Sequence, residues 1–379
     1  MTRVLLAPDK FKGSLSAPAV ADALARGLLS RRPDAEVRRV PVADGGDGTV
    51  DAAVAAGFTR VPATVHGPLG EPGTETSFAL DGHVAVVEMA DACGLLRLPP
   101  GVLDPLRASS RGLGDVIRAA VDAGARRVVV GIGGSASTDG GAGMLQALGA
   151  RIVDAEGREI PSGAAGLGDV TDVDLSPLRQ RMAGVDVVVA CDVDNPLLGP
   201  RGAAAVYGPQ KGATADDVER LEARLARWAH VLGSRTSADA AGAPGAGAAG
   251  GVGFAALAAL GARLAPGIDL VLDLVGFDQH VQGADLVVVG EGSLDEQSLA
   301  GKAPVGVARR ARDAGVPVVA VCGRRDVDDP ALLEAGIGRA LALTDLEPDE
   351  SVCRRDAARL LEAVGGVVAD MLPRSATPD

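Results

Sequence analysis

Aromatic side chains are scarce in this sequence of 379 residues, in which Phe, Trp and Tyr together make up 2%. Cores built on large rings are therefore excluded, and the apolar 47% of the chain has to pack Val, Leu, Ile and Ala. The 52 glycines fit tightly wound strand–loop–helix units better than a sandwich or a barrel. A chain of this length exceeds what one compact domain usually holds, so we expect two domains.

The cysteines do not indicate a zinc site or a redox site. The four cysteines have neither the C-x-x-C spacing nor the spacing of zinc ligands, so we expect buried thiols.

No apolar run approaches the length of about 18 residues that indicates a transmembrane helix. Met1 leads directly into a polar-capped strand and not into a signal peptide, so we expect a cytoplasmic protein.

Positive charge is in deficit, and the formal net charge is −13. Nucleic acid needs a basic stripe, and an anionic membrane surface needs basic clusters, so we expect neither as a partner. An anionic small-molecule substrate is still allowed, because a few Lys and Arg side chains can reverse the field inside a cleft. The sequence leaves the oligomeric state open, with a homodimer among the allowed states.

Short β-branched segments alternate with amphipathic helical segments at both ends of the chain, which is typical of an α/β fold. Two strands near the N-terminus cannot form a stable open sheet alone, whereas three more strands follow near the C-terminus. We therefore predict a discontinuous Rossmann-like parallel-sheet domain. It comprises residues 1–60 plus 280–379.

The intervening residues 61–279 are predicted to form an inserted second α/β domain with a mixed sheet. A β-hairpin signal over residues 74–88 marks the change of architecture. The Gly- and Ala-rich run 236–251 is expected to be a loop, either a plain linker or a mobile lid over the substrate. The active site is expected in the cleft between the two domains.

Polar, acidic or Gly-rich clusters follow five of the expected strands. In open parallel sheets, ligands bind at the carboxyl ends of the strands. Each single cluster is also compatible with an ordinary turn. Their repetition, with scarce lysines among them, favours phosphoryl transfer, which needs carboxylates for Mg²⁺, cations for phosphate charge and backbone N–H groups near phosphate oxygens. The clusters cover residues 7–17, 41–49, 131–141, 191–196 and 290–295, and Lys302 follows the last of them.

The usual phosphate-binding signatures are absent. The only Gly-Lys dipeptide has Glu296 and Ala303 at two positions where a P-loop requires Gly and Ser or Thr. No His-Arg-Asp of a protein-kinase catalytic loop occurs, and the four histidines lie outside the five clusters. A histidine-based nucleophile or base is therefore not expected.

A dinucleotide fingerprint offers a rival interpretation. The sequence Gly131-x-Gly133-x-x-Ala136 follows an expected strand and precedes a helix, as in an NAD-dependent dehydrogenase. Its extension through Thr138 and Asp139 fits a triphosphate at a helix N-terminus better than a hydride donor. The dehydrogenase and a non-catalytic sensor of sugar acids or nucleotides are kept as alternatives.

The same segments resemble the bacterial glycerate kinase family of type I. The resemblance implies a two-domain α/β fold and transfer of the γ-phosphoryl group from ATP, with Mg²⁺, to D-glycerate, with 2-phosphoglycerate favoured over 3-phosphoglycerate. The matching stretches are APDKFKGSLSA at 7–17, PVADGGDGT at 41–49, SSRGLGDVI at 109–117, GIGGSASTDGGAGMLQALGAR at 131–151, ACDVDNPLLGPRGAAAVYGPQKG at 190–212, GAAGGVG at 247–253 and GEGSLDEQSLAGKAPVGVA at 290–308.

Two positions depart from the family pattern. The family often has Arg where Ser293 stands and Asn where Thr138 stands. Without an Arg at position 293, we expect Lys302 or Arg111 to carry more of the anion clamping.

The candidate site residues fall into four groups. The catalytic candidates are Lys10 and, as alternatives for the base that accepts the hydroxyl proton, Asp44 and Asp47. The candidates for binding glycerate are Asp9, Lys12, Ser14 and Arg111, with Lys10 as a further partner of its carboxylate. The candidates for binding ATP are Gly133, Gly134, Ser135, Thr138, Gly140, Gly141 and Lys302. The first candidate ligand of Mg²⁺ is Asp192, with Glu291 or Asp295 as the competitor.

Overall fold

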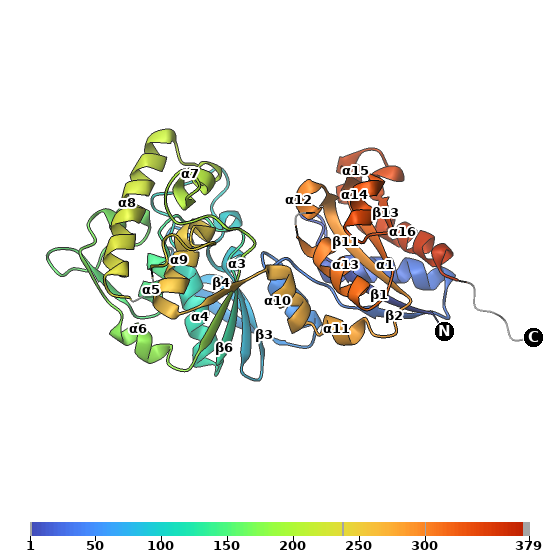
Figure 1. Cartoon of the computed structure of the whole chain (residues 1–379), viewed down its shortest axis with the longest axis horizontal. Coiled ribbons are helices and arrows are strands. Elements are labelled where there is room, and N and C mark those ends of the chain that lie inside the picture. Colours follow the sequence, from blue (N-terminus) through green and yellow to red (C-terminus); the bar gives the residue numbers. More distant parts are fainter. Residues whose placement is uncertain (1, 237–238, 300, 374–379) are drawn as a thin grey trace, which may run out of the picture. The chain divides into compact units, whose positions relative to one another are not determined.

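The computed structural model describes residues 2–236, 239–299 and 301–373. The chain divides into two compact units (Figure 1). Unit 1 comprises residues 1–44, 51–57 and 268–379, and unit 2 comprises residues 45–50 and 58–267. Among the described residues, no helix combines the length and the apolar composition that a membrane crossing requires.

Unit 1 is built on a sheet of five strands that are all parallel. The order across the sheet is β13-β12-β11-β1-β2, the doubly wound arrangement in which the strand order reverses between β1 and β11. This confirms the predicted Rossmann-like parallel sheet. Its strands are β1 (Arg3–Pro8), β2 (Glu36–Arg39), β11 (Leu286–Leu294), β12 (Val318–Arg325) and β13 (Arg339–Ala342).

Side chains of these strands alternate between two cores, because successive residues of a strand point to opposite faces. In β1, Val4 and Leu6 belong to one core and Leu5 and Ala7 to the other. The first face is covered by α1 (Ala17–Arg31), α15 (Glu350–Arg355) and α16 (Ala357–Met371). The second face is covered by α2 (Thr49–Ala55), α10 (Gly267–Leu274), α11 (Phe277–His280), α13 (Ala303–Asp313) and α14 (Asp329–Glu334).

The segment that contains α10 and α11 packs in unit 1. Its Ile268, Val271 and Phe277 side chains are buried in the second core of that unit. A Cβ atom at Gly306 of α13 would lie 2.4 Å from Ile268 Cγ1, so α10 and α13 pack closely. The predicted boundary at residue 280 assigns α10 and α11 to the inserted domain, whereas their apolar side chains are buried in unit 1.

Unit 2 contains a six-stranded mixed sheet in the order β10-β9-β6-β5-β4-β3. The first four strands run parallel, and β4 is antiparallel to both of its neighbours. A small antiparallel pair, β7 (Arg151–Val153) and β8 (Asp172–Asp174), lies apart from this sheet. The predicted mixed sheet is confirmed. Its strands are β3 (Thr59–Val65), β4 (Thr74–Asp81), β5 (Val84–Glu88), β6 (Arg127–Gly131), β9 (Asp186–Ala190) and β10 (Arg263–Ala265).

Four helices of unit 2 bear on the candidate site: α4 (Arg111–Asp122), α5 (Ala142–Ala147), α8 (Ala215–Gly233) and α9 (Ala248–Leu260). The helix α8 begins with a capping box, in which the side chains of Thr214 and Asp217 each accept the other residue's backbone N–H. Its Trp228, the single tryptophan of the chain, is fully buried. The remaining helices are α3 (Met89–Cys93), α6 (Ser176–Arg181), α7 (Ala203–Tyr207) and, in unit 1, α12 (Glu296–Leu299).

The described part of the Gly- and Ala-rich run 236–251 is a loop up to Gly247, as predicted, but it is packed and not open; residues 237 and 238 lie outside the described residues. Ala246 and Ala248 are buried, and α9 starts within the run. Ala249 and the two glycines after it adopt left-handed backbone conformations, which cost L-residues free energy. A Cβ atom at Gly250 would lie 2.1 Å from the Ser137 carbonyl oxygen. Small residues here permit a close approach of two backbones. The linker and the lid both stay predictions.

Candidate active site

Three carboxyl groups gather in unit 1 where β1, β2 and β11 end. Asp9 directly follows β1 and is 7% exposed. Burial raises the pKa of Asp9 to about 7; the positive charge of Lys10 opposes this change, and the negative charges of Asp44 and Glu291 add to it. A carboxyl with a pKa near neutrality, at the point where the sheet reverses its strand order, has the properties of a general base.

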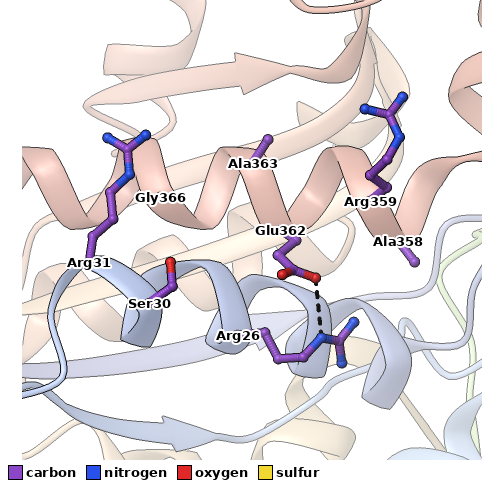
Figure 2. A pocket seen from close by; sticks show the side chains of 8 residues that line it. All are labelled: Arg26, Ser30, Arg31, Ala358, Arg359, Glu362, Ala363 and Gly366. Atoms are coloured by element: carbon purple, nitrogen blue, oxygen red, sulfur yellow. Dashed lines mark hydrogen bonds and ion pairs between the residues drawn. The ribbon is translucent and has the colours of Figure 1, made fainter.

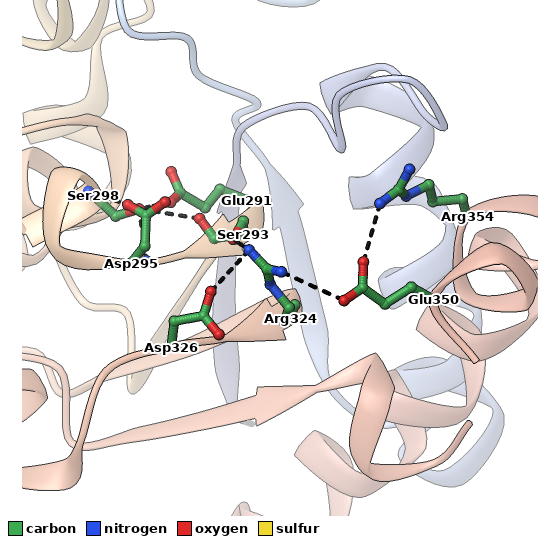
Figure 3. A network of polar contacts seen from close by, with 8 residues as sticks. All are labelled: Glu291, Ser293, Asp295, Ser298, Arg324, Asp326, Glu350 and Arg354. Carbon is green, nitrogen blue, oxygen red and sulfur yellow. Dashed lines mark hydrogen bonds and ion pairs between the residues drawn. The ribbon is translucent and has the colours of Figure 1, made fainter. Parts of the chain in front are cut away.

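Glu291 is the second carboxyl of this group with a raised pKa. Burial raises the pKa of Glu291 to about 7, while the hydrogen bond from Ser298 and the charge of Lys302 lower it. The Ser298 hydroxyl donates to Glu291 Oε1, as Figure 3 shows. Asp295 instead accepts the Ser298 backbone N–H at 3.0 Å, which lowers its pKa and fixes the start of α12. Asp295 thus has a structural task that Glu291 lacks.

The chain contains four lysines among 37 basic residues, and three of them lie in unit 1. Lys10 is half-buried beside Asp9, and Lys12 is exposed. Lys302 is half-buried at the start of α13, and its charge acts on Glu291. The predicted ligand Ser14 donates its hydroxyl hydrogen to the backbone oxygen of residue 354 at 2.6 Å. Cations and carboxylates therefore occur together in this unit.

Position 293 holds a serine, but the guanidinium group of Arg324 lies next to it. Ser293 of β11 pairs in register with Arg324 of β12, and Arg324 Nη2 lies 3.4 Å from Ser293 Oγ. Ion pairs with Asp326 at 2.9 Å and Glu350 at 3.4 Å hold this arginine in place (Figure 3). The sequence did not point to Arg324, because the two residues become neighbours only through strand pairing.

Unit 2 presents the Gly-rich loop 131–141 after β6. The segment 45–50 lies directly on this loop, since a Cβ atom at Gly133 would be 2.9 Å from Gly46 Cα. The buried Glu88 carboxylate accepts the Val50 backbone N–H at the start of α2. Asp47 belongs to this segment of unit 2, whereas Asp44 belongs to unit 1. The two base candidates named from the sequence thus fall in different units.

Asp139 organises the far end of the Gly-rich loop. It is fully buried, and burial raises its pKa, while hydrogen bonds from Ser110 and from loop amides lower it. Its Oδ2 accepts the backbone N–H of Ser110 at 2.8 Å and the hydroxyls of Ser109 and Ser110 at 3.2 and 3.0 Å. Its Oδ1 accepts the Gly141 backbone N–H at 3.1 Å. The carboxylate therefore ties the loop to the start of α4.

Several polar atoms around Asp139 are buried without a hydrogen-bond partner in the described part of the chain. They are Arg111 Nε, Ser137 Oγ and Thr138 Oγ1. Buried polar atoms are normally paired, so an unpaired group in a folded protein calls for a ligand or a water. The nearby Lys211, which the sequence did not single out beyond its matching stretch, is buried and donates from Nζ to the Ser137 carbonyl oxygen at 2.6 Å.

The predicted ATP-binding residues of this loop differ in exposure. Gly133 and Gly134 are exposed at its tip, and Ser135 is 8% exposed. Thr138 is buried, and a Cβ atom at Gly140 or Gly141 would strike Trp228 or Ala255. Thr138, Gly140 and Gly141 are therefore packed inside the protein and not exposed on the loop surface.

Asp192 follows β9 and is exposed. Its Oδ1 accepts the Gly267 backbone N–H at 2.8 Å. Across residues 2–236, 239–299 and 301–373, no group of three or more His, Cys, Asp or Glu side chains is arranged to hold a metal ion.

A surface hollow of about 510 Å³ lies between α1 and α16 and contains none of the predicted site residues. Arg26 and Glu362, which line it, form an ion pair with a distance of 3.3 Å between Nε and Oε2 (Figure 2). Arg31 is paired with Asp370. The charged side chains Arg26, Glu362 and Arg31, which line the hollow, thus have partners of opposite charge within the protein.

Comparisons with known proteins all identify the same family. The family model described as the glycerate kinase family matches residues 4–373. The chain is 47% identical to a glycerate kinase from Bacillus subtilis (strain 168) and 44% identical to a glycerate 2-kinase from Escherichia coli (strain K12), in both cases over 88% of each chain. A solved crystal structure described as glycerate kinase 2 from Salmonella typhimurium LT2 superposes with a TM-score of 0.86 at 41% identity, over 98% of each chain.

Proposed function

Because the chain belongs to the glycerate kinase family and is an ATP-dependent kinase, we propose that it transfers the γ-phosphoryl group of ATP to D-glycerate, with 2-phosphoglycerate as the favoured product. The Escherichia coli relative named glycerate 2-kinase supports this product over 3-phosphoglycerate. The observation that carries the proposal is the gathering of Asp9 and Glu291 with Lys10 and Lys302 in unit 1, where burial raises the pKa of both carboxyls. The cytoplasmic location stays a prediction, as does an active site between two domains.

The carboxyls of unit 1 serve as the base in this proposal. The attacking hydroxyl oxygen of glycerate forms a bond to the γ-phosphorus, its proton passes to a carboxylate, and ADP leaves. Asp9 and Glu291 suit this role best, because a base with a pKa near the working pH combines availability with driving force. Asp44 and Asp47 remain the alternatives drawn from the sequence.

Cationic groups bind the anions of both substrates in this proposal. Lys10, Lys12 and Arg111 are proposed partners of the glycerate carboxylate, and Ser14 is a further proposed partner of glycerate. Lys302 and the exposed tip at Gly133 and Gly134 are proposed to bind the ATP phosphates, because amide N–H groups and lysines stabilise phosphate charge. A monomer and a homodimer both remain compatible with it.

Mg²⁺ is proposed to accompany the nucleotide. A nucleotide-bound magnesium ion usually takes one or two protein carboxylates and completes its shell with phosphate oxygens and waters, so no prebuilt cage is needed. Asp192 fits as such a ligand, and Glu291 or Asp295 is the competitor. When bound, the ion would neutralise charge that develops on the phosphate oxygens.

Incubation of the protein with D-glycerate, Mg·ATP and NAD⁺ tests the proposed reaction. ADP without NADH is expected, and ³¹P NMR of the product should show a phosphate ester at the 2-hydroxyl. NADH without ADP would restore the dehydrogenase interpretation of residues 131–136. Absence of both products with ligand binding intact would favour a sensor.

Replacement of Asp192 by asparagine tests the metal ligand. The Asn side-chain oxygen can still accept the Gly267 N–H, so we expect Tm to stay within about 2 °C. A neutral amide is a poorer ligand of a hard cation, so kcat should fall at least about tenfold and more Mg²⁺ should be needed. Asp194→Asn, at an exposed position paired with Arg201 in the same loop, is the control. Turnover of Asp192→Asn within about threefold of wild type at saturating Mg²⁺ would remove Asp192 from the metal site.

A further inference from the structure

Lys211 differs from the other three lysines of the chain because it is buried. It ends the short 3₁₀ turn Pro209–Lys211 and is 2% exposed. An ammonium group inside a protein loses its hydration and is tolerated where hydrogen bonds and opposite charge replace the lost water. Burial lowers the pKa of Lys211 to about 7, and the charge of Asp139 acts in the opposite direction.

The contacts of Lys211 converge on one stretch of the Gly-rich loop. Its Nζ donates to the Ser137 carbonyl oxygen at 2.6 Å. On the same carbonyl, a Cβ atom at Gly250 would lie at 2.1 Å, and Gly140 N donates to the Gly250 oxygen at 2.9 Å. The peptide that follows Ser137 is thus held both by an ammonium group and by the left-handed turn at the start of α9.

The same stretch contains buried side chains that the protein leaves unpaired. Ser137 and Thr138 are fully buried, and their hydroxyl oxygens have no partner within the described residues. The next residue, Asp139, accepts hydrogen bonds from Ser110 and Gly141. Unpaired polar groups in a dry interior cost free energy, and proteins retain such a cost mainly where function needs the conformation.

We propose that Lys211 is a positioning residue for the nucleotide phosphates. By fixing the Ser137 carbonyl and compensating Asp139, it sets the shape of residues 137–141, and so the direction in which the exposed tip at Gly133 and Gly134 presents its N–H groups. Lys211 acts through the loop and does not touch ATP. The inference rests on the proposed function of this loop, and it adds a buried residue with a specific role.

The chain contains its own reporter of this loop. Trp228, the only tryptophan, donates from Nε1 to the Gly140 carbonyl oxygen at 2.9 Å and is fully buried. Its fluorescence therefore senses the loop with no competing tryptophan. Titration of the wild-type protein with a non-hydrolysable ATP analogue and Mg²⁺ should change the Trp228 emission and give the Kd of the analogue.

The test is Lys211→Met, which retains much of the length of the side chain and removes the donor and the charge. We expect the Kd of the ATP analogue and the KM for ATP to rise at least about tenfold, with the KM for D-glycerate changed by less than about threefold. The matched control is Leu178→Ala, a buried core position of the same unit in α6. It should lower Tm and leave both ATP parameters within about threefold of wild type.

Unchanged ATP parameters in a folded Lys211→Met would overturn the proposal, and so would an equal loss of ATP affinity in Leu178→Ala, which would assign Lys211 to stability alone. If Lys211→Met does not fold, Lys211→Gln replaces it, because glutamine is polar but one atom too short to hold the Ser137 carbonyl, and the same outcomes apply. A wild-type protein that neither binds the analogue nor forms ADP would instead contradict the proposed function.

Discussion

Replacement of Asp9 by asparagine should lower kcat by at least about 100-fold and raise thermal stability at pH 8 at the same time. The loss follows if the carboxylate accepts the hydroxyl proton, since general-base catalysis contributes about 10² to 10⁴ in rate. The gain follows from burial, because a neutral amide needs no ionisation in a dry site. The Asn side-chain oxygen can still accept the Lys10 N–H that Asp9 binds at 2.6 Å.

The direction of the Asp9 pKa shift determines how the stability change depends on pH. The folded-state pKa of Asp9, about 7, lies above its ordinary value of 3.8, so folding favours the protonated acid. Stability from the protonated form is complete below about pH 4 and is lost as the pH rises through about 7. The difference between the two pKa values corresponds to at most about 4 kcal/mol at pH 8. Turnover of the wild type should rise with pH through the same range, because the base must be ionised.

Thermal unfolding at pH 4 and pH 8 and a pH–rate profile check this expectation. Tm of Asp9→Asn should exceed that of the wild type by at least about 4 °C at pH 8 and match it near pH 4. Asp22→Asn, at an exposed position of α1 paired with Arg39, is the control and should change neither Tm nor kcat appreciably. A kcat of Asp9→Asn within threefold of wild type would transfer the role to Glu291 or Asp44.

Replacement of Gly27 by alanine should destabilise unit 1 by about 3 kcal/mol. Gly27 lies in α1 where that helix packs against α16, and Figure 2 shows these two helices side by side. A Cβ atom at Gly27 would lie 1.7 Å from the Glu362 carbonyl oxygen, and one at Gly365 would lie 2.3 Å from Leu24 O. Both obstacles are backbone atoms, so relief requires the helices to separate.

Circular dichroism melting should show this effect as a fall in Tm of about 6–12 °C. Gly233→Ala is the matched control: it is the last residue of α8 and has no atom within 4 Å of its added Cβ. This control should leave Tm equal or slightly raised, because alanine favours helix over glycine by up to about 1 kcal/mol. An unchanged Tm in Gly27→Ala would mean that α1 and α16 are less closely packed than the structure has them.

The sheets were predictable because their signals are local. The apolar runs of β1 and β11, and the hairpin between β4 and β5, are properties of consecutive residues, and these elements lie where the sequence indicated. The break between α15 and α16 at Asp356, whose backbone is not helical, was not predictable, because no Gly or Pro stands there to mark it.

The parts of the candidate site that the sequence missed depend on distant contacts. Arg324 reaches Ser293 through strand pairing, and Lys211 reaches Ser137 through tertiary packing. The run before α9 was interpreted as flexible because its residues are small, whereas the same smallness allows Gly250 to approach another backbone. Rarity was the usable signal for Lys211, since the chain has only four lysines.

That rarity has a practical consequence for anyone who modifies this protein chemically. Arginine, which supplies most of the positive charge, does not react with acylating or reductively alkylating reagents, whereas the ε-amino group of lysine does. Of the four lysines, Lys211 is buried, and the other three belong to the candidate site of unit 1. Dyes, biotin or resin attached through lysine would therefore collect at the proposed substrate residues. An engineered surface cysteine or a terminal tag is the better handle.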